Sequence, residues 1–295
     1  LMFGTGGGGG SIWSQGASFF SATSPINEIL ARDAFTLEDL LDEDELLQEV
    51  KGMNDGLLDF LSQDSQVQAL VEYVAVPAPA GANDARAIKY PYLACELICC
   101  DVNSILDVLV KREDGFPHLS LLFSHLHGDG EPDSKLMGFL SKIVQLLCVR
   151  RGLAMLAFLN ESAGRADVPS VLPSLLRHLR SDSVHAMLRQ MCMIQPPEGA
   201  SLHVLPPWLK APLGSDAEAD LVEHLVTMLS DPSREAGHHS ASSFLEFILT
   251  APSEGRAALA GSLPLELQAA MATPSPLMFD GESDEEEEEE EMPTA

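Results

Sequence analysis

The sequence predicts an all-α fold, an armadillo/HEAT-like helical-repeat solenoid with disordered termini. Two observations support this. Apolar residues recur at steps of three and four along most of the chain, and no run of β-branched and aromatic residues alternates with a period of two. The apolar segments are of similar size and are bounded by Gly, Pro, Asp or Ser. Stacked pairs of such amphipathic helices bury their apolar faces against one another and build a continuous core.

The composition divides the 295 residues into three regions. Residues 1–12 contain the run GTGGGGGS, which is typical of a flexible linker, and we expect them to be disordered. Residues 13–272 are predicted to form the helical-repeat domain. Residues 273–295 include seven consecutive Glu and are expected to form a disordered acidic tail, because clustered carboxylates must stay solvated.

The first helices are predicted from their start signals. Ser24-Pro25 indicates a helix start, because proline is tolerated at the first helical position. Thr36 with Asp39 fits a capping box, and Asp42 with Glu45 fits a second one. Residues 36–51 are therefore expected to form two short helices or one kinked helix.

Later helices follow the same rhythm. Asn54 marks either a turn or a buried polar residue that bonds to a neighbouring helix. A further helix is predicted over residues 67–76, then a loop, then a helical segment over residues 89–110. The remaining apolar segments are LSLLFSHL, KLMGFLSKIVQLLCVRRGLAMLAFL, VLPSLLRHL, SVHAMLRQMCMI, LVEHLVTML and SSFLEFIL. No strict sequence period is visible, so the repeat is inferred from the spacing of the helices.

The net charge restricts the partners. With 45 Asp and Glu against 17 Lys and Arg, the formal charge is −28, which disfavours nucleic acid and acidic membrane surfaces and favours basic partners. No apolar run is long enough for a membrane helix, so we expect no membrane insertion. Five cysteines without a paired C-x-x-C pattern indicate reduced thiols and a cytoplasmic or nuclear protein, with no metal or other cofactor.

Catalytic motifs are missing from the sequence. It contains no phosphate-binding loop, no G-x-S-x-G elbow and no H-E-x-x-H, so we expect no enzymatic activity. One alternative is a metal-dependent hydrolase that uses His125, His127 and Asp129, because imidazole and carboxylate groups are metal ligands. Gly128, Gly130 and Pro132 equally describe a polar loop between helices.

Two acidic stretches have several interpretations. The carboxylates between Thr36 and Lys51 can cap helices, where the positive end of the helix dipole stabilises them, or they can form a docking surface. The polyglutamate tail allows a second alternative, an acidic chaperone or scaffold for basic proteins such as histones. Ser283, followed directly by acidic residues, is a candidate site for an acidophilic kinase.

Two separate blocks resemble one known family. Trp13, TLEDLLDEDELLQEVK (36–51), Asn54 and LLDFL form the first, and KYPYLACELICCDV (89–102) forms the second. Together they resemble the SAPS family, regulatory subunits of the protein phosphatase 6 type of Ser/Thr phosphatase. The resemblance implies a non-catalytic helical-repeat subunit that binds a phosphatase catalytic subunit and directs its substrate choice, alongside an ankyrin-repeat subunit.

The resemblance also nominates contact residues. The candidates for partner binding are Asp42, Glu43, Asp44 and Glu45 in the first block and Lys89, Tyr90, Pro91 and Glu96 in the second. Two departures stand out: Val50 replaces a cysteine that is frequent in the family, and the helical part before the acidic tail is shorter than usual.

Overall fold

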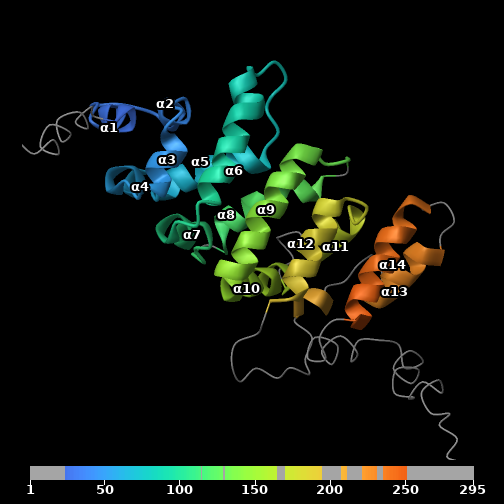
Figure 1. Cartoon of the computed structure of the whole chain (residues 1–295). Coiled ribbons are helices and arrows are strands. Elements are labelled where there is room, and N and C mark those ends of the chain that lie inside the picture. The colour runs from blue at the N-terminus through green and yellow to red at the C-terminus, as the bar shows by residue number, and fades with distance from the viewer. Residues whose placement is uncertain are drawn as a thin grey trace, which may run out of the picture.

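Every regular element that the structure describes is a helix, which confirms the predicted all-α class (Figure 1). The structure is a computed structural model that describes residues 24–113, 115–128, 130–164, 170–194, 207–210, 221–230 and 235–250. The termini predicted to be disordered, 1–12 and 273–295, lie outside the described residues, as do Trp13, Asp129 and Ser283.

Five helices form the N-terminal part: α1 (Pro25–Leu30), α2 (Leu37–Leu41), α3 (Leu46–Lys51), α4 (Asp55–Leu61) and α5 (Asp64–Ala75). The capping box of α2 is confirmed, since the N–H of Thr36 donates to Asp39 Oδ2 at 2.8 Å and the N–H of Asp39 donates to Thr36 Oγ1 at 3.3 Å. Residues 36–51 thus form two short helices, one of the two predicted arrangements.

Asn54 lies in a turn and also bonds to neighbouring helices, as the two predictions proposed, but it is half-buried rather than buried. Its side-chain oxygen accepts the N–H of Leu57 at 3.2 Å and caps α4. Its amide nitrogen donates to Asn27 Oδ1 and to Glu49 Oε2, each at 2.9 Å. One side chain therefore ends a turn and ties together α1, α3 and α4.

The remaining elements run from α6 to α14. The helical segment predicted over 89–110 is interrupted after Ile98, because Asp101 adopts a left-handed backbone with φ of 63°. The elements are η2 (a π-helical turn, Ala85–Lys89), α6 (Tyr90–Ile98), α7 (Asn103–Leu109), α8 (Pro117–Phe123), η3 (a 3₁₀ turn, Ser124–His127), α9 (Ser134–Arg150), α10 (Gly152–Gly164), α11 (Val171–Arg177), α12 (Asp182–Cys192), η4 (Pro207–Lys210), α13 (Leu221–Ser230) and α14 (Glu235–Thr250).

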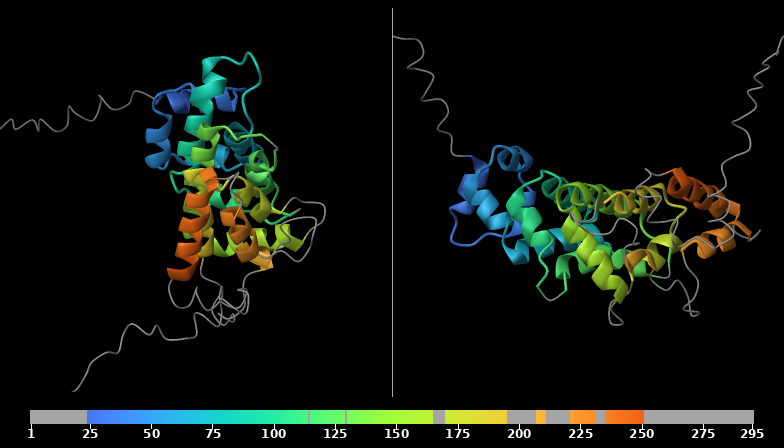
Figure 2. Two further views of the ribbon diagram at one scale, coloured as in Figure 1. Left: turned by 90° about the vertical axis from the view of Figure 1, so that its right-hand side faces the viewer. Right: turned by 90° about the horizontal axis from the view of Figure 1, so that it is seen from below.

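A regular structural period underlies the fold. Helices α3, α6, α9 and α12 begin at residues 46, 90, 134 and 182, so they follow one another at steps of 44, 44 and 48 residues. Each packs on the one before it, and α14 continues the row by packing on α12. Steps of this size match HEAT and armadillo repeats. The predicted solenoid is confirmed, and Figure 2 shows the helices following one another along an elongated body.

Side chains join successive repeats at the same spacing. In four ion pairs an acid bonds to a base that lies 46 to 49 residues further along the chain. These pairs keep neighbouring repeats in register. They are Asp42 with Lys89, Glu96 with Lys142, Asp101 with Arg150, and Glu131 with Arg180.

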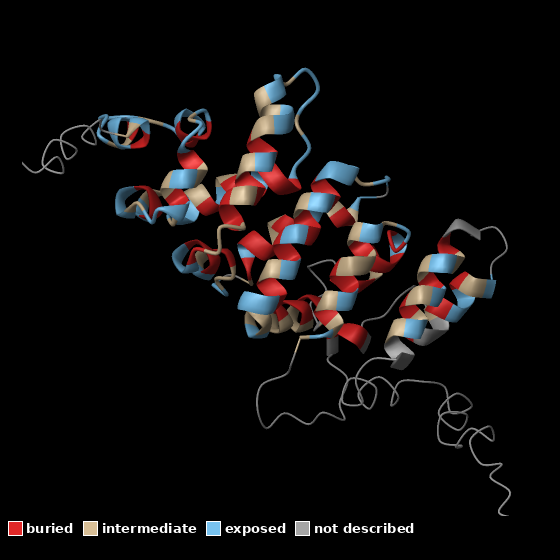
Figure 3. Cartoon of the chain, viewed as in Figure 1, coloured by how far each residue is buried: buried red, intermediate tan, exposed pale blue. Residues whose placement is uncertain are grey.

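The core follows the predicted apolar stripes. Leu40, Leu97, Ile143 and Met187 are completely buried, one on each of four helices along the array. In Figure 3 the buried residues form one side of each helix and face the neighbouring helices. The leucines of the first acidic block, Leu40, Leu41 and Leu46, belong to this core, and its carboxylates lie outside it.

A membrane-spanning helix is not found in the described part of the chain. No helix there is by itself both long and apolar enough to cross a bilayer. Helices α9 and α10 reach that length only when taken together, and the chain bends by 114° where they meet.

Candidate functional site

The two sequence blocks meet in space at one side chain, Asp42. Its Oδ1 lies 3.0 Å from Nζ of Lys89, which also donates to the main-chain oxygen of Asp42 at 3.2 Å. The hydroxyl of Tyr90 lies 3.3 Å from both carboxylate oxygens of Asp42. Three of the predicted contact residues therefore form one network that joins α2 to the start of α6.

The second predicted capping box was wrong. Asp42 does not cap α3: it ends α2, where its N–H is bonded to the carbonyl of Glu38 and the N–H of Glu43 is bonded to the carbonyl of Leu40. Glu45 occupies the N-cap position of α3, and no side chain caps that helix. The Asp42 carboxylate has a cation and a hydroxyl within reach, and a charge-assisted hydrogen bond to Lys89 is stronger than a bond to a neutral backbone amide.

The three acids after Asp42 have no such partner. Asp44 and Glu45 are exposed and Glu43 is half-buried, all in the turn between α2 and α3. Within the described residues, none of the three forms an ion pair. Glu43, Asp44 and Glu45 thus add three carboxylates to one short turn, whose orientation the Asp42 network stabilises.

A second layer supports this network from behind. The Tyr73 hydroxyl donates a hydrogen bond to Glu38 Oε1, and the rings of Tyr73 and Tyr90 meet edge to face at 5.4 Å. The guanidinium of Arg86 lies over the Tyr73 ring, with its carbon 4.7 Å from the ring centroid, and donates to the carbonyl of Val76. These contacts fix the position of α2 relative to α5 and α6.

Burial and hydrogen bonding shift several pKa values here. The hydrogen bond from Tyr73 lowers the pKa of Glu38 below its usual value. Burial, and then the Glu38 carboxylate, raise the pKa of Tyr73, while burial and the Asp42 charge raise the pKa of Tyr90. Both tyrosines therefore remain protonated donors at neutral pH, and the Glu38 carboxylate remains an acceptor.

Exposed apolar side chains lie beside the acidic turn. Ile88 is 55% exposed and Tyr92 is 49% exposed, and four residues separate them, so they share one side of the helical stretch that begins α6. Tyr92 follows Lys89 by one helical turn, and this end of α6 stands out from the body at the top of Figure 1. We name the set Asp42, Glu43, Asp44, Glu45, Ile88, Lys89 and Tyr92 the α2–α6 surface.

Two of the predicted contact residues lie elsewhere. Pro91 is buried in the first turn of α6 and belongs to the core. Glu96 is half-buried and pairs with Lys142 of α9 at 2.5 Å, so it joins two repeats. Sequence reasoning missed Ile88 and Tyr92, although their four-residue spacing on either side of Lys89-Tyr90-Pro91 was a usable signal.

The alternative metal site is not favoured. His125 Nε2 accepts the N–H of Asp133 at 3.0 Å, and His127 Nδ1 lies 2.9 Å from Ser174 Oγ, so the two rings have separate partners. Burial lowers the pKa of both histidines. Among the described residues, no three His, Cys, Asp or Glu side chains gather in a way that could hold a metal ion. This agrees with the interhelical-loop interpretation.

Comparison with known proteins finds phosphatase 6 regulatory subunits among the relatives of this chain. No family model matches the chain, and no solved structure matches it. It is 30% identical over 223 residues to mouse serine/threonine-protein phosphatase 6 regulatory subunit 1, which covers 75% of this chain and 24% of the relative. It is 29% identical over 225 residues to mouse regulatory subunit 2, covering 76% of this chain and 22% of that relative.

A more distant relative comes from fission yeast. The extragenic suppressor of kinetochore protein 1 of Schizosaccharomyces pombe is 24% identical over 187 residues, 60% of this chain and 21% of that protein. The chain thus spans roughly a quarter of the length of the curated relatives it matches. The resemblance predicted from the two sequence blocks is confirmed, since over about three quarters of its length this chain is similar to the phosphatase 6 regulatory subunits.

Proposed function

We propose that this chain is a non-catalytic regulatory subunit that binds the catalytic subunit of a Ser/Thr phosphatase of the protein phosphatase 6 type and directs its substrate choice. The similarity to phosphatase 6 regulatory subunits supports the proposal, as does a repeat architecture that exposes a long surface for partners. We also propose the ankyrin-repeat subunit implied by the family resemblance as a further partner. The cytoplasm or the nucleus is the proposed compartment, and the five free cysteines suit a reducing environment.

The α2–α6 surface is the proposed contact for the catalytic subunit. The observation that carries this assignment is the network in which Lys89 and Tyr90 hold Asp42, because it joins the two blocks that resemble the family. The same network presents unpaired carboxylates beside exposed Ile88 and Tyr92. Aromatic and apolar anchors bordered by charges are typical of binding hot spots. The expected partner surface is basic around an apolar patch, and its association should weaken with salt.

A capture experiment with the full chain tests the proposal. Tagged wild-type protein is mixed with purified catalytic subunit of the protein phosphatase 6 type and compared with Glu43→Lys/Asp44→Lys/Glu45→Lys, which leaves the Asp42 network in place. The matched control, Glu28→Lys/Asp33→Lys/Asp59→Lys, makes the same change of charge at exposed positions of the same half of the molecule. Circular dichroism is used to check that all three proteins have the same helicity.

Three outcomes are informative. We expect the first variant to lose at least tenfold in affinity and the control to stay within about threefold of wild type, because surface charges far from a contact act only through the screened field. Equal binding by all three proteins would contradict the surface assignment but keep the function. Failure of folded wild-type protein to bind would contradict the function itself.

A further inference from the structure

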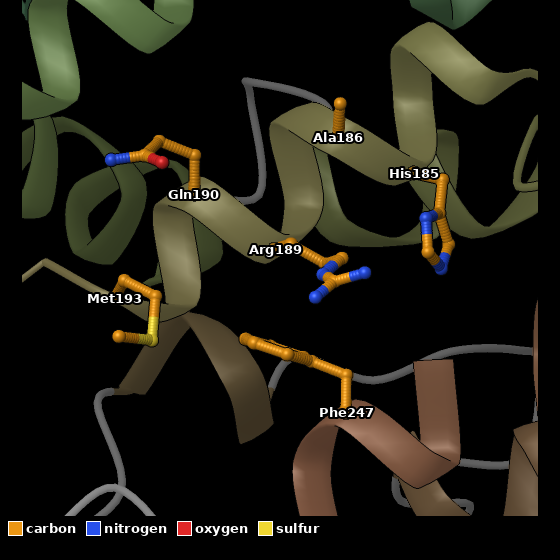
Figure 4. A pocket seen from close by; sticks show the side chains of 6 residues that line it. All are labelled: His185, Ala186, Arg189, Gln190, Met193 and Phe247. Atoms are coloured by element: carbon orange, nitrogen blue, oxygen red, sulfur yellow. The ribbon is translucent and has the colours of Figure 1, made fainter. Parts of the chain in front are cut away.

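A groove lies between α12 and α14 (Figure 4). These two helices stand at the other end of the array from α2 and α6 (Figure 1). Its volume is about 450 Å³, which suits a few side chains of a peptide. His185, Ala186, Arg189, Gln190 and Met193 line it from α12 and the residue after it, and Phe247 lines it from α14.

The groove combines an apolar aromatic wall with a cation. The guanidinium carbon of Arg189 lies 4.6 Å from the centroid of the Phe247 ring, and Phe244 stacks with Phe247 at 6.0 Å. Met193 is 38% exposed beside them. Nε2 of His185 is buried and has no hydrogen-bond partner among the described residues. An occupant with an aromatic or aliphatic side chain followed by carboxylates would match these groups.

The charge around the groove differs from that of the rest of the molecule. Residues 24–113 carry 18 acidic and 6 basic side chains, whereas the described residues from α9 to the end of α12 carry 2 acidic and 7 basic ones. Helix α14 adds only Glu235 and Glu246. Four of these seven bases already pair with acids of the preceding repeats. An acidic segment is therefore repelled less by the α9–α12 region than by the N-terminal half, and Arg189 is the base that lines the groove. The seven bases are Lys135, Lys142, Arg150, Arg151, Arg177, Arg180 and Arg189.

The chain itself supplies a segment of this composition. Leu277, Met278 and Phe279 are followed directly by DGESDEEEEEEE, which holds ten acids in residues 280–291. This segment follows α14, which lines the groove, and 28 residues lie between Thr250 and Phe279. A chain of that length spans up to about 95 Å, far more than the groove requires. Because both parts belong to one chain, the effective concentration of the segment is on the order of millimolar.

We propose that residues 277–286 of the same chain bind in the α12–α14 groove, with Phe279 against Met193 and Phe247 and the following carboxylates at Arg189. The apolar triplet would cover the aromatic wall, and Asp280 and Glu282 would pair with the guanidinium. Binding brings the acidic tail onto the least acidic part of the described surface. It leaves the α2–α6 surface open, so this inference stands independently of the proposed phosphatase contact.

Photo-crosslinking in the full chain tests the proposal. Phe279 is replaced by the photoreactive residue p-benzoyl-phenylalanine, the dilute protein is irradiated, and the products are mapped by mass spectrometry. Benzophenone inserts readily next to methionine sulfur, so the expected product is an intramolecular link to Met193 or to other residues of α12 and α14. The expected yield falls at least fivefold in Arg189→Glu and recovers in the charge exchange Arg189→Glu/Asp280→Arg. Lys135→Glu, an exposed base on α9, serves as the matched control and should change the yield less than twofold.

Each other outcome overturns the proposal. Links between two molecules would assign the groove to a second copy of the chain. Links that map elsewhere, no link at all, or a yield that Arg189→Glu leaves unchanged would each exclude the segment from the groove. If circular dichroism shows that Arg189→Glu does not fold, the crosslink yield is measured at 0.05 and 0.5 M salt in the protein whose only change is the photoreactive residue at position 279. A crosslink yield that falls less than twofold between the two salt concentrations would then contradict the proposal.

Discussion

Asp42 and Lys89 stand 47 residues apart in the sequence, and their charged groups lie 3.0 Å apart in the structure. The pair is one of a series in which an acid of one repeat bonds to a base of the next. It also joins the two blocks by which the chain resembles the phosphatase regulatory subunits. Experiments can measure separately how much the Asp42–Lys89 pair contributes to the stability of the fold and to the binding of a partner.

The Asp42–Lys89 pair should contribute little to stability. The two side chains are 57% and 39% exposed, and exposed ion pairs contribute about 0–1 kcal/mol. A double-mutant cycle with Asp42→Ala and Lys89→Ala, followed by urea unfolding, should therefore give a coupling energy below about 1 kcal/mol. A coupling above about 2 kcal/mol would show that the pair is part of a more cooperative network with Tyr90.

Core leucines should dominate the free energy of unfolding. Leu97 of α6 is completely buried, so Leu97→Ala should cost about 2–5 kcal/mol by removing apolar contacts and leaving a cavity. Leu153→Ala removes the same atoms from a side chain that is 58% exposed and should change stability by less than about 0.5 kcal/mol. Urea unfolding followed by circular dichroism measures both. Equal losses would contradict the assignment of α6 to the core.

The hydrogen bond between Tyr73 and Glu38 should be visible in a titration. The Tyr73 hydroxyl is the largest cause of the lowered pKa of Glu38. In Tyr73→Phe that donor is lost, so the pKa of Glu38 should rise toward its usual value, as measured by carboxyl chemical shifts in NMR. Gln68→Ala, which removes a hydrogen-bond donor from Glu72 instead, is the control and should leave the Glu38 titration unchanged.

Stability should fall as the pH drops through the range of histidine titration. Burial is the main cause of lowered pKa values for His125, His127, His178 and His185. Below the usual value of 6.5, the unfolded chain takes up protons that the folded chain resists, so stability is complete above 6.5 and is lost toward the lower folded pKa values. The free energy of unfolding should decrease between pH 7.5 and 5.5.

One variant isolates a single histidine in this effect. His127→Asn keeps a polar group near Ser174 but cannot titrate, so the decrease between pH 7.5 and 5.5 should become smaller than in wild type. His239→Asn changes an exposed histidine and is the matched control. A wild-type free energy of unfolding that stays constant or rises as the pH falls would contradict the argument.

Local features of the fold were predictable from sequence because they depend on near neighbours. The Thr36–Asp39 capping box, the start of α1 at Pro25 and the turn at Asn54 each involve residues within one helical turn. The leucine stripe placed Leu40, Leu41 and Leu46 in the core for the same reason. The second capping box was predicted wrongly because the partners of Asp42 are distant in sequence, and no local pattern reports them.

The candidate surface was predictable only in part. Asp42, Lys89 and Tyr90 were nominated as contacts and lie together, but Pro91 is buried and Glu96 pairs with Lys142. Helical periodicity gives the side of a helix that a residue occupies, not the helix that packs against it. The exposure of Ile88 and Tyr92 depends on the way η2 and α6 extend beyond their neighbours, which is a tertiary property.

The sequence by itself determined the helical class, the acidic character and the kinship with phosphatase regulatory subunits, since these follow from apolar spacing, composition and two recognisable blocks. Only the tertiary structure decided the period of 44 to 48 residues, the meeting of Asp42 with Lys89, and the groove at Arg189. The physical reason is the distance along the sequence over which each interaction acts. Capping and periodicity act within a few residues, whereas the repeat arises from packing and ion pairs between side chains more than forty residues apart, where helices of unequal length and variable loops hide any fixed sequence interval.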